Sequence, residues 1–159
     1  MFNRFLLFLL VLLLLVGGSN SCSRRPVIHH YEQVMVDGWT PGDTVKFYID
    51  SLKHSGNYEP IIGIRTSVSV LYPYRSLWLA VRQQWHNPEY ERTDTIECLL
   101  TDDNGDTMGN GVSIYQHTFP QEPIYLEQGN TAEISISHIM RHDMLPGITE
   151  IGLRLQPTD

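Results

Sequence analysis

The sequence contains very little lysine and alanine, with two residues of each among its 159 positions. Helices in soluble proteins are usually rich in alanine, leucine, lysine and glutamate, whereas strands favour β-branched and aromatic residues. After residue 21, isoleucine and valine together number 21, against ten leucines. The chain is therefore poor in helix-forming residues, and its composition predicts a protein built from strands.

Positive charge and cysteine are also scarce. Eleven Lys and Arg against 18 Asp and Glu give a formal net charge of −7, which argues against binding to nucleic acid, because that binding needs a basic surface. Two cysteines, Cys22 and Cys98, are too few for a disulfide-stabilised scaffold or a four-cysteine zinc site. The length fits one domain.

The longest hydrophobic run is too short to cross a membrane. Residues 5–16 read FLLFLLVLLLLV, whereas a transmembrane helix needs about 20 apolar residues. Arg4 precedes the run, as expected for a secretory signal peptide. Cys22 then stands where a bacterial lipoprotein carries its lipid-accepting cysteine, after a sequence (SNSC) that resembles a lipobox without the usual leucine. An ordinary secretory signal with a chance cysteine is the alternative.

These features predict a division of the chain into three parts. Residues 1–21 are a lipoprotein signal peptide, residues 22–26 are a lipidated tether, and residues 27–159 are a single β-sandwich domain. Removing 21 of the 159 residues leaves 138, and the loss of Arg4 changes the net charge from −7 to −8. With Cys22 acylated, Cys98 has no disulfide partner, and we interpret it as a small core residue.

Apolar and polar residues alternate in several short runs, which is typical of antiparallel strands with one buried face. The expected inward-facing sets are Val45, Phe47 and Ile49; Ile62, Ile64, Thr66, Val68 and Val70; Leu77, Leu79 and Val81; Ile96, Cys98 and Leu100; Ala132, Ile134, Ile136 and His138; and Ile151, Leu153 and Leu155. Turn residues rich in Gly, Pro, Asn and Asp separate the runs. We expect six to eight strands in an antiparallel β-sandwich of jelly-roll or immunoglobulin-like type.

The sequence contains no recognisable catalytic motif, and we expect neither catalysis nor a cofactor. The acidic segment 102–106 does not match a calcium-binding EF-hand loop, because Thr107 and Ser113 occupy the positions of the required Gly and Glu. We interpret it as a hairpin tip. His138 and His142 are four residues apart, a spacing that can bind zinc on a helix, but this segment is predicted to be the end of a strand.

Aromatic and polar residues supply the candidate contact sites. Tyr74 and Trp78 fall on the strand face opposite Leu77 and Leu79, where they would either stack on a sugar or a protein partner or belong to the core. A second group lies near a predicted turn. It consists of His138, Arg141, His142 and Asp143.

Several segments together resemble the GldH family of gliding-motility lipoproteins of the Bacteroidota. They follow the cysteine in the order GWTPGDTVKFYI (38–49), YPYRSLWLAVR (72–82), DTIECLLTDDNGDTMGNG (94–111) and RHDMLPGITEIGLRL (141–155). The resemblance covers nearly all of the mature chain. It implies a lipoprotein that gliding species need for surface movement, acting beside the type IX secretion machinery, although members also occur in species that do not glide.

From the resemblance we expect a non-catalytic protein, held in the cell envelope by the lipid at Cys22, that binds or stabilises envelope proteins of the gliding and secretion apparatus. Lipoproteins exported to the cell surface in this phylum typically carry acidic residues soon after the cysteine. Ser23-Arg24-Arg25 is basic instead, which favours a periplasm-facing anchor in the outer or inner membrane. The alternative function is that of a carbohydrate-binding module that uses Tyr74 and Trp78.

Overall fold

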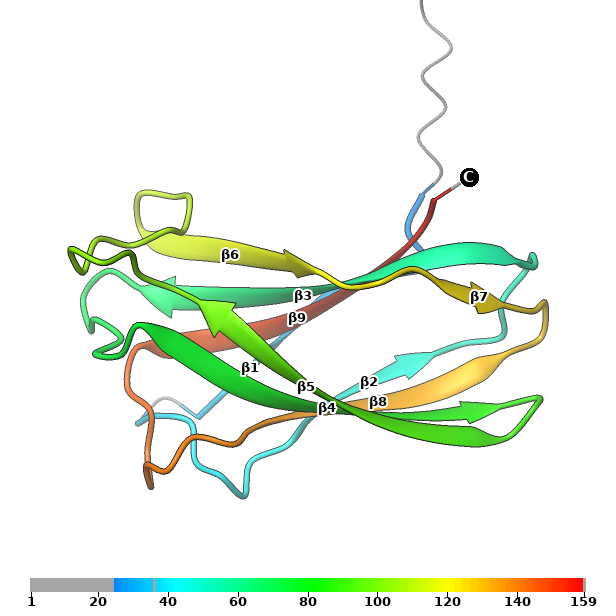
Figure 1. The fold of residues 1–159 in the computed structure, drawn as a ribbon, viewed down its shortest axis with the longest axis horizontal. Helices are drawn as coiled ribbons and strands as arrows, with labels where there is room; N and C mark the ends of the chain where they lie inside the picture. Colours follow the sequence, from blue (N-terminus) through cyan, green and yellow to red (C-terminus); the bar gives the residue numbers. More distant parts are fainter. Residues whose placement is uncertain (1–24, 36, 159) are drawn as a thin grey trace, which may run out of the picture.

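The computed structural model describes residues 25–35 and 37–158, which form nine strands and no helix. All strand pairs are antiparallel, and the strands build two sheets that face each other as a sandwich (Figure 1). The strands are β1 (Ile28–Gln33), β2 (Val45–Ile49), β3 (Gly56–Ser67), β4 (Ser76–His86), β5 (Tyr90–Leu99), β6 (Ile114–Pro120), β7 (Ile124–Leu126), β8 (Thr131–His138) and β9 (Ile148–Pro157). The all-β sandwich expected from the sequence is confirmed.

The strand order identifies the kind of sandwich. One sheet has the order β1-β9-β3-β6, with β7 also paired to β3, and the other has the order β2-β8-β4-β5. The chain therefore changes sheet after every strand except within the β4–β5 hairpin and between β6 and β7. This repeated crossing between two sheets is the jelly-roll arrangement. Of the two types left open by the sequence, the jelly roll is the one that the chain forms.

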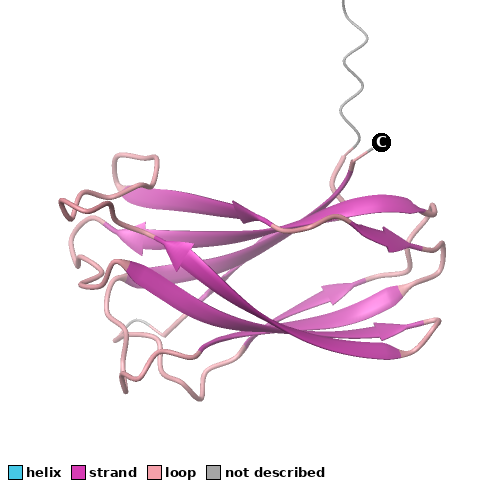
Figure 2. Cartoon of the chain, viewed as in Figure 1, coloured by secondary structure: helices cyan, strands magenta, loops and turns pink. Residues whose placement is uncertain are grey.

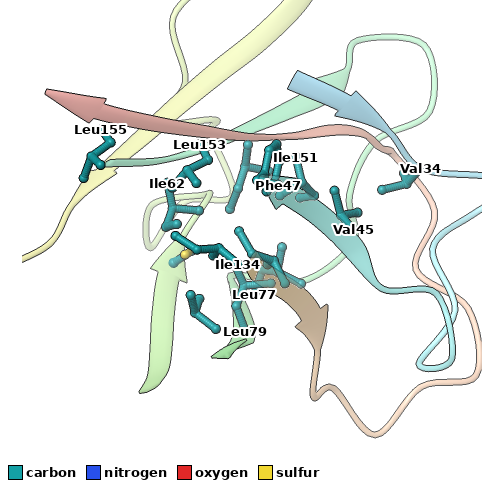
Figure 3. Close-up of a cluster of buried hydrophobic side chains, with 14 of the residues drawn as sticks. Val34, Val45, Phe47, Ile62, Leu77, Leu79, Ile134, Ile151, Leu153 and Leu155 are labelled. Atoms are coloured by element: carbon teal, nitrogen blue, oxygen red, sulfur yellow. The ribbon is translucent and has the colours of Figure 1, made fainter. Parts of the chain in front are cut away.

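The core lies between the sheets and is built from the inward-facing residues of both. Figure 3 shows Ile62, Ile151 and Leu153 of the five-stranded sheet opposite Leu77, Leu79 and Ile134 of the four-stranded sheet. The strictly alternating burial of β4 and β8 confirms the predicted inward faces of these strands. Cys98 is fully buried, as expected. Burial of the Cys98 thiol raises its pKa to about 12, so the sulfur remains neutral at physiological pH.

One strand is shorter at its C-terminal end than the sequence pattern predicts. The alternation continues through Val68 and Val70, but β3, which contains Ile64, ends at Ser67. The reason is local, because the Ser67 hydroxyl accepts hydrogen bonds from the backbone N–H groups of Ser69 and Val70. A serine that binds the backbone ahead of it in this way turns the chain and competes with strand pairing.

Strand β1 shields two glycines on the outer face of the five-stranded sheet. Gly63 and Gly152 are paired across β3 and β9, and Tyr31 of β1 is paired with Gly152. A Cβ atom at Gly63 would lie 2.3 Å from the Tyr31 hydroxyl, and one at Gly152 would lie 2.5 Å from the Tyr31 ring. The Arg65 guanidinium lies 3.8 Å above the centre of the same ring. The absence of side chains at the two glycines therefore leaves room for the Tyr31 ring to lie against the sheet.

The sandwich has two ends of different character. At one end Ile28 pairs with Leu155, so the start of the described chain lies beside the end of β9. We name this the tether end. The opposite end, named the loop end, carries the segments that follow β1, β3, β5 and β8, and long irregular loops gather there (Figures 1 and 2). Four of the jelly roll's crossing connections thus meet at the end of the sandwich opposite the start of the described chain.

Candidate functional site

The predicted contact residues lie at or near the loop end. Trp78 is the third residue of β4, and its side chain is 39% exposed on the outer face of the four-stranded sheet. Leu99 of β5 lies diagonally across from it on the same face, because Leu99 pairs with Ser76. On the other side, the backbone N–H of Ile139 donates to the carbonyl of Trp78. These three exposed apolar side chains form a row across the sheet.

Tyr74 and His142 are brought together although they are far apart in the chain. Their rings are stacked, with centroids 4.3 Å apart and an angle of 15° between the planes. Tyr74 also meets Tyr72 edge-on, with 5.5 Å between the ring centroids. Tyr74 is therefore half-buried, and the stack connects the segment after β3 to the segment after β8. One face of the predicted aromatic platform is thus already occupied by a histidine of the same chain.

His138 lies inside the molecule rather than on its surface. It is 2% exposed, and its ring meets the Trp39 indole edge-on at a centroid distance of 5.2 Å. Neither ring nitrogen has a hydrogen-bond partner of good geometry. Burial lowers the pKa of His138, while the nearby backbone of Trp39 and Thr40 and the charge of Asp43 oppose that shift. A partner could not contact His138 directly, so we leave it out of the candidate contact surface.

Arg141 and Asp143 are exposed on the segment after β8, beside the exposed side of His142. The six contact residues predicted from the sequence therefore divide into three groups. Trp78, Arg141, His142 and Asp143 are exposed, Tyr74 is half-buried, and His138 is in the core. The exposed members share the loop end. Cys22, the predicted lipidation site, lies outside the described residues.

Exposed apolar side chains are a further feature of the loop end, and Trp78 is the one among them that the sequence marks as a candidate contact residue. Fourteen large apolar side chains of the described residues are exposed, and ten of them lie at this end. The ten are Met35, Val70, Leu71, Trp78, Leu99, Met108, Val112, Ile114, Ile139 and Met144. The signal for them is present in the sequence, because several are apolar residues placed within glycine-rich or proline-rich turns, where no strand alternation buries them.

A hollow of about 300 Å³ opens between the segments after β3 and β5. Leu71, Tyr72 and Leu100 line its apolar side, and Asp106 lines its polar side. His117 of β6 lies at the bottom, where Thr66 Oγ1 is 3.4 Å from its Nε2. Burial lowers the pKa of His117, so the imidazole is neutral at physiological pH. The hollow can accept a side chain that has both an apolar part and a polar tip.

The acidic segment 102–106 is a hairpin tip, as the sequence predicts. Asp102 Oδ1 accepts hydrogen bonds from the backbone N–H groups of Asn104 and Asp106, at 2.8 and 2.9 Å. These bonds lower the pKa of the Asp102 carboxyl. Asp103 forms an exposed ion pair with Arg75, with 2.6 Å between the charged atoms. Asp102 is thus used in turn formation, and Asp103 is used in bracing the neighbouring loop.

Within residues 25–35 and 37–158, no three His, Cys, Asp or Glu side chains are arranged to hold a metal ion. His138 and His142, whose spacing suggested one, have different environments, the first in the core and the second against Tyr74. The same part of the chain has no helix able to span a bilayer.

A second cleft, of about 230 Å³, opens between the sheets where β5 faces β7 and the residues just before it. Its walls are the core residues Ile62, Val81 and Leu153, and its rim carries Arg92 and Asp94. Arg92 and Asp94 are paired with each other, since Arg92 Nε lies 2.7 Å from Asp94 Oδ1. Gln83 also donates to Asp94, at 3.1 Å, and the exposed Glu122 adds a further carboxylate to the lining.

A protein-family model matches most of the chain. The family described as GldH lipoprotein matches residues 26–155, which is most of the chain and almost all of the sandwich. A comparison with curated proteins finds no match.

Solved structures resemble the chain only weakly. Eiger TNF from S. frugiperda is 10% identical, with 85% of this chain and 95% of that chain covered and a TM-score of 0.39. An uncharacterised protein of Listeria monocytogenes, lmo2446, is 14% identical with a TM-score of 0.42, and the match covers 83% of this chain but 12% of that one. A family 35 carbohydrate-binding module from Cellvibrio japonicus is 14% identical, with 83% and 99% covered and a TM-score of 0.36.

Proposed function

The chain belongs to the GldH lipoprotein family, and on that premise we propose a non-catalytic role in the gliding and type IX secretion apparatus. Family membership makes it a gliding-motility lipoprotein, which implies anchoring in the cell envelope. We propose further that the lipid is attached at Cys22, after removal of residues 1–21. The sandwich then binds or stabilises partner proteins of the apparatus.

One observation carries this proposal. The described chain starts at the tether end, beside the end of β9, whereas exposed apolar and charged side chains gather at the opposite loop end. The sandwich between them is a rigid spacer, because its strands are paired within both sheets and one cluster of buried side chains joins the two sheets. A lipid-anchored adaptor needs this arrangement, since an anchor and a contact surface at the same end would compete for space at the membrane.

Two acyl chains would hold the protein on a membrane almost permanently, because each buried CH₂ contributes about 0.8 kcal/mol. The basic Ser23-Arg24-Arg25 segment favours an anchor that faces the periplasm. Protease treatment of intact cells tests the orientation. Survival of the protein until the outer membrane is opened is expected, and its loss from intact cells would refute a periplasmic location.

The proposed function is tested by deletion and complementation in the source strain. Deletion should abolish surface spreading or, in a strain that does not glide, reduce type IX secretion. The wild-type gene should restore the phenotype, whereas Cys22→Ala should leave an unacylated protein outside the membrane fraction and restore little. Normal spreading and secretion in the deletion strain would contradict the proposal.

A carbohydrate-binding module is the alternative, and the exposure of Trp78 on a sheet face supports it. Stacking on a sugar needs a free aromatic face, which Trp78 offers and Tyr74, covered by His142, offers only in part. Binding of the purified protein to a glycan array, lost on Trp78→Ala, would favour this alternative. Absence of binding by the wild-type protein would remove it.

A further inference from the structure

The loop end combines many exposed apolar side chains with an excess of negative charge. Ten of the fourteen exposed large apolar side chains in the described chain lie there, among them Leu71 at 70% and Val112 at 92% exposure. The other four are spread over the rest of the molecule, namely Val27, Tyr48, Tyr90 and Tyr125. Scattered apolar residues are normal on a protein surface, whereas a gathering of them indicates an interaction site.

The charges around this surface are mostly negative. The segments after β1, β3, β5 and β8 carry six aspartates and two arginines among their described residues. The aspartates are Asp37, Asp43, Asp102, Asp103, Asp106 and Asp143, and the arginines are Arg75 and Arg141. Arg75 is already paired with Asp103, so the excess charge available to a partner is negative.

The loops that form the surface are braced to one another, so that its shape is preformed. The Tyr74–His142 stack joins the segment after β3 to the segment after β8, and the Ser67 N–H donates to the Gly147 carbonyl at 2.8 Å. The Arg75–Asp103 ion pair joins the segment after β3 to the segment after β5. A preformed surface loses less conformational entropy on binding than a mobile one.

From these observations we propose that the loop end, centred on Leu71 and the hollow beside it, docks a protein whose surface has an apolar centre surrounded by lysine and arginine. This inference rests on the proposed function and names the chemistry of the partner. Leu71 and Tyr72 receive an apolar residue, while Asp106 faces the partner's basic groups. Complementary charge of this kind speeds association and selects the partner.

The negative charge argues against two other binding partners, an anionic lipid bilayer and a second copy of this chain. A bilayer with anionic lipids attracts basic segments, and this surface would be repelled by it. A second copy of the chain would bring the same aspartates face to face, and like charges opposed across an interface are costly. A basic protein surface is the occupant that the charge and the apolar centre favour together.

Site-specific photo-cross-linking in living cells of the source strain tests the inference with the full, lipidated chain. The photoreactive residue benzoylphenylalanine replaces Leu71 or Val112 at the loop end, and Tyr48 or Tyr125 as matched controls near the tether end. The controls are 63% and 65% exposed, close to the 70% of Leu71. The cross-linked peptides are then identified by mass spectrometry.

We expect the same protein to be cross-linked from Leu71 and Val112, through a peptide containing or bordering lysine or arginine, and not from the two controls. Asp106→Lys should lower the yield from Leu71 at least fivefold, because it opposes the partner's charge. The same change at the exposed Asp50, which follows β2, should leave the yield within twofold. Cross-links to lipid or to a second copy, equal yields at the control positions, or no cross-link would each overturn the inference.

The same strains separate this inference from the proposed function. If the deletion strain spreads and secretes normally, the proposed function fails whatever the cross-links show. If the deletion strain is defective but the cross-links form at Tyr48 and Tyr125, the proposed function stands and the assignment of the loop end is wrong.

Discussion

At the scale of single residues, most of the chemistry of this protein is determined by burial. Cys98, His117 and His138 each carry a reactive or titratable group, and each is less than 6% exposed. Burial raises the pKa of Cys98 and lowers the pKa of His117 and His138, and both shifts favour the neutral form of the side chain. These side chains therefore act as core residues, and the groups that a partner could contact lie on the loops.

The Cys98 thiol should be unreactive in the folded protein. Because its pKa is raised to about 12, almost none of it is thiolate at pH 8, and reaction with iodoacetamide requires the thiolate. We expect no labelling of the Cys98 peptide within an hour at pH 8 and full labelling in 6 M guanidinium, as measured by mass spectrometry. Rapid labelling of the native protein would show that Cys98 is not core.

Gly63 should tolerate no side chain while Tyr31 is present. Gly63→Ala places a Cβ atom against the Tyr31 ring, and we expect it to lower the free energy of unfolding by about 1–3 kcal/mol. Gly42→Ala is the control, because a Cβ atom at Gly42 would have no neighbour within 4 Å. In a Tyr31→Ala background the cost of Gly63→Ala should shrink, as urea denaturation can measure. An equal cost in both backgrounds would refute the contact.

His138 should make the fold less stable in mild acid. Its folded pKa lies below its unfolded value of about 6.5, so the unfolded state binds more protons and stability falls as the pH drops below that value. The free energy of unfolding of His138→Leu should decline less between pH 7.5 and pH 5 than that of the wild type. Identical pH profiles for the two proteins would contradict this account.

At the scale of elements, the strand patterns are largely readable from the sequence. Alternation in β2, β4, β8 and β9 predicts which side chains face inward, because one residue in two must be apolar when one sheet face is buried. Strands β1 and β6 are not predicted by the same pattern. In β1 the burial does not alternate, and in β6 the buried inward residue at position 117 is a histidine rather than an aliphatic side chain.

The candidate site is harder to predict from the sequence than the fold. The outward direction of Trp78 follows from strand alternation with Leu77, but the stacking of Tyr74 on His142 depends on two loops that meet only in the folded chain. The burial of His138 is indicated by its place in the alternating run of β8. The exposure of Leu71 follows from the turn at Ser67, whose hydrogen bonds end β3 early.

A pair of leucines distinguishes the core strands from the loop surface. Leu79 of β4 is fully buried and Leu71 is 70% exposed. Leu79→Ala should lower the free energy of unfolding by about 2–5 kcal/mol, whereas Leu71→Ala should change it by no more than about 0.5 kcal/mol. Urea denaturation of both variants measures the difference. A large loss of stability in Leu71→Ala would mean that Leu71 belongs to the core and is not available to a partner.

At the scale of the whole molecule, the jelly roll places the start of the described chain and the proposed contact surface at opposite ends of the sandwich. Both chain ends of the described part meet at the tether end, and the crossing loops meet at the other. Part of the net charge of −8 that is expected after removal of residues 1–21 lies on those loops. This distribution suits a protein that is held by lipid and binds a basic partner at a distance from its own membrane.

Complementation of a deletion strain with two matched variants shows whether function depends on the loop end. Leu71→Asp and Tyr125→Asp each put a charge on an exposed apolar residue, one at the loop end and one near the tether end. At equal protein levels in the membrane, Leu71→Asp should fail to restore spreading or secretion, and Tyr125→Asp should restore it fully. Equal restoration by both variants, or failure of Tyr125→Asp alone, would contradict the account.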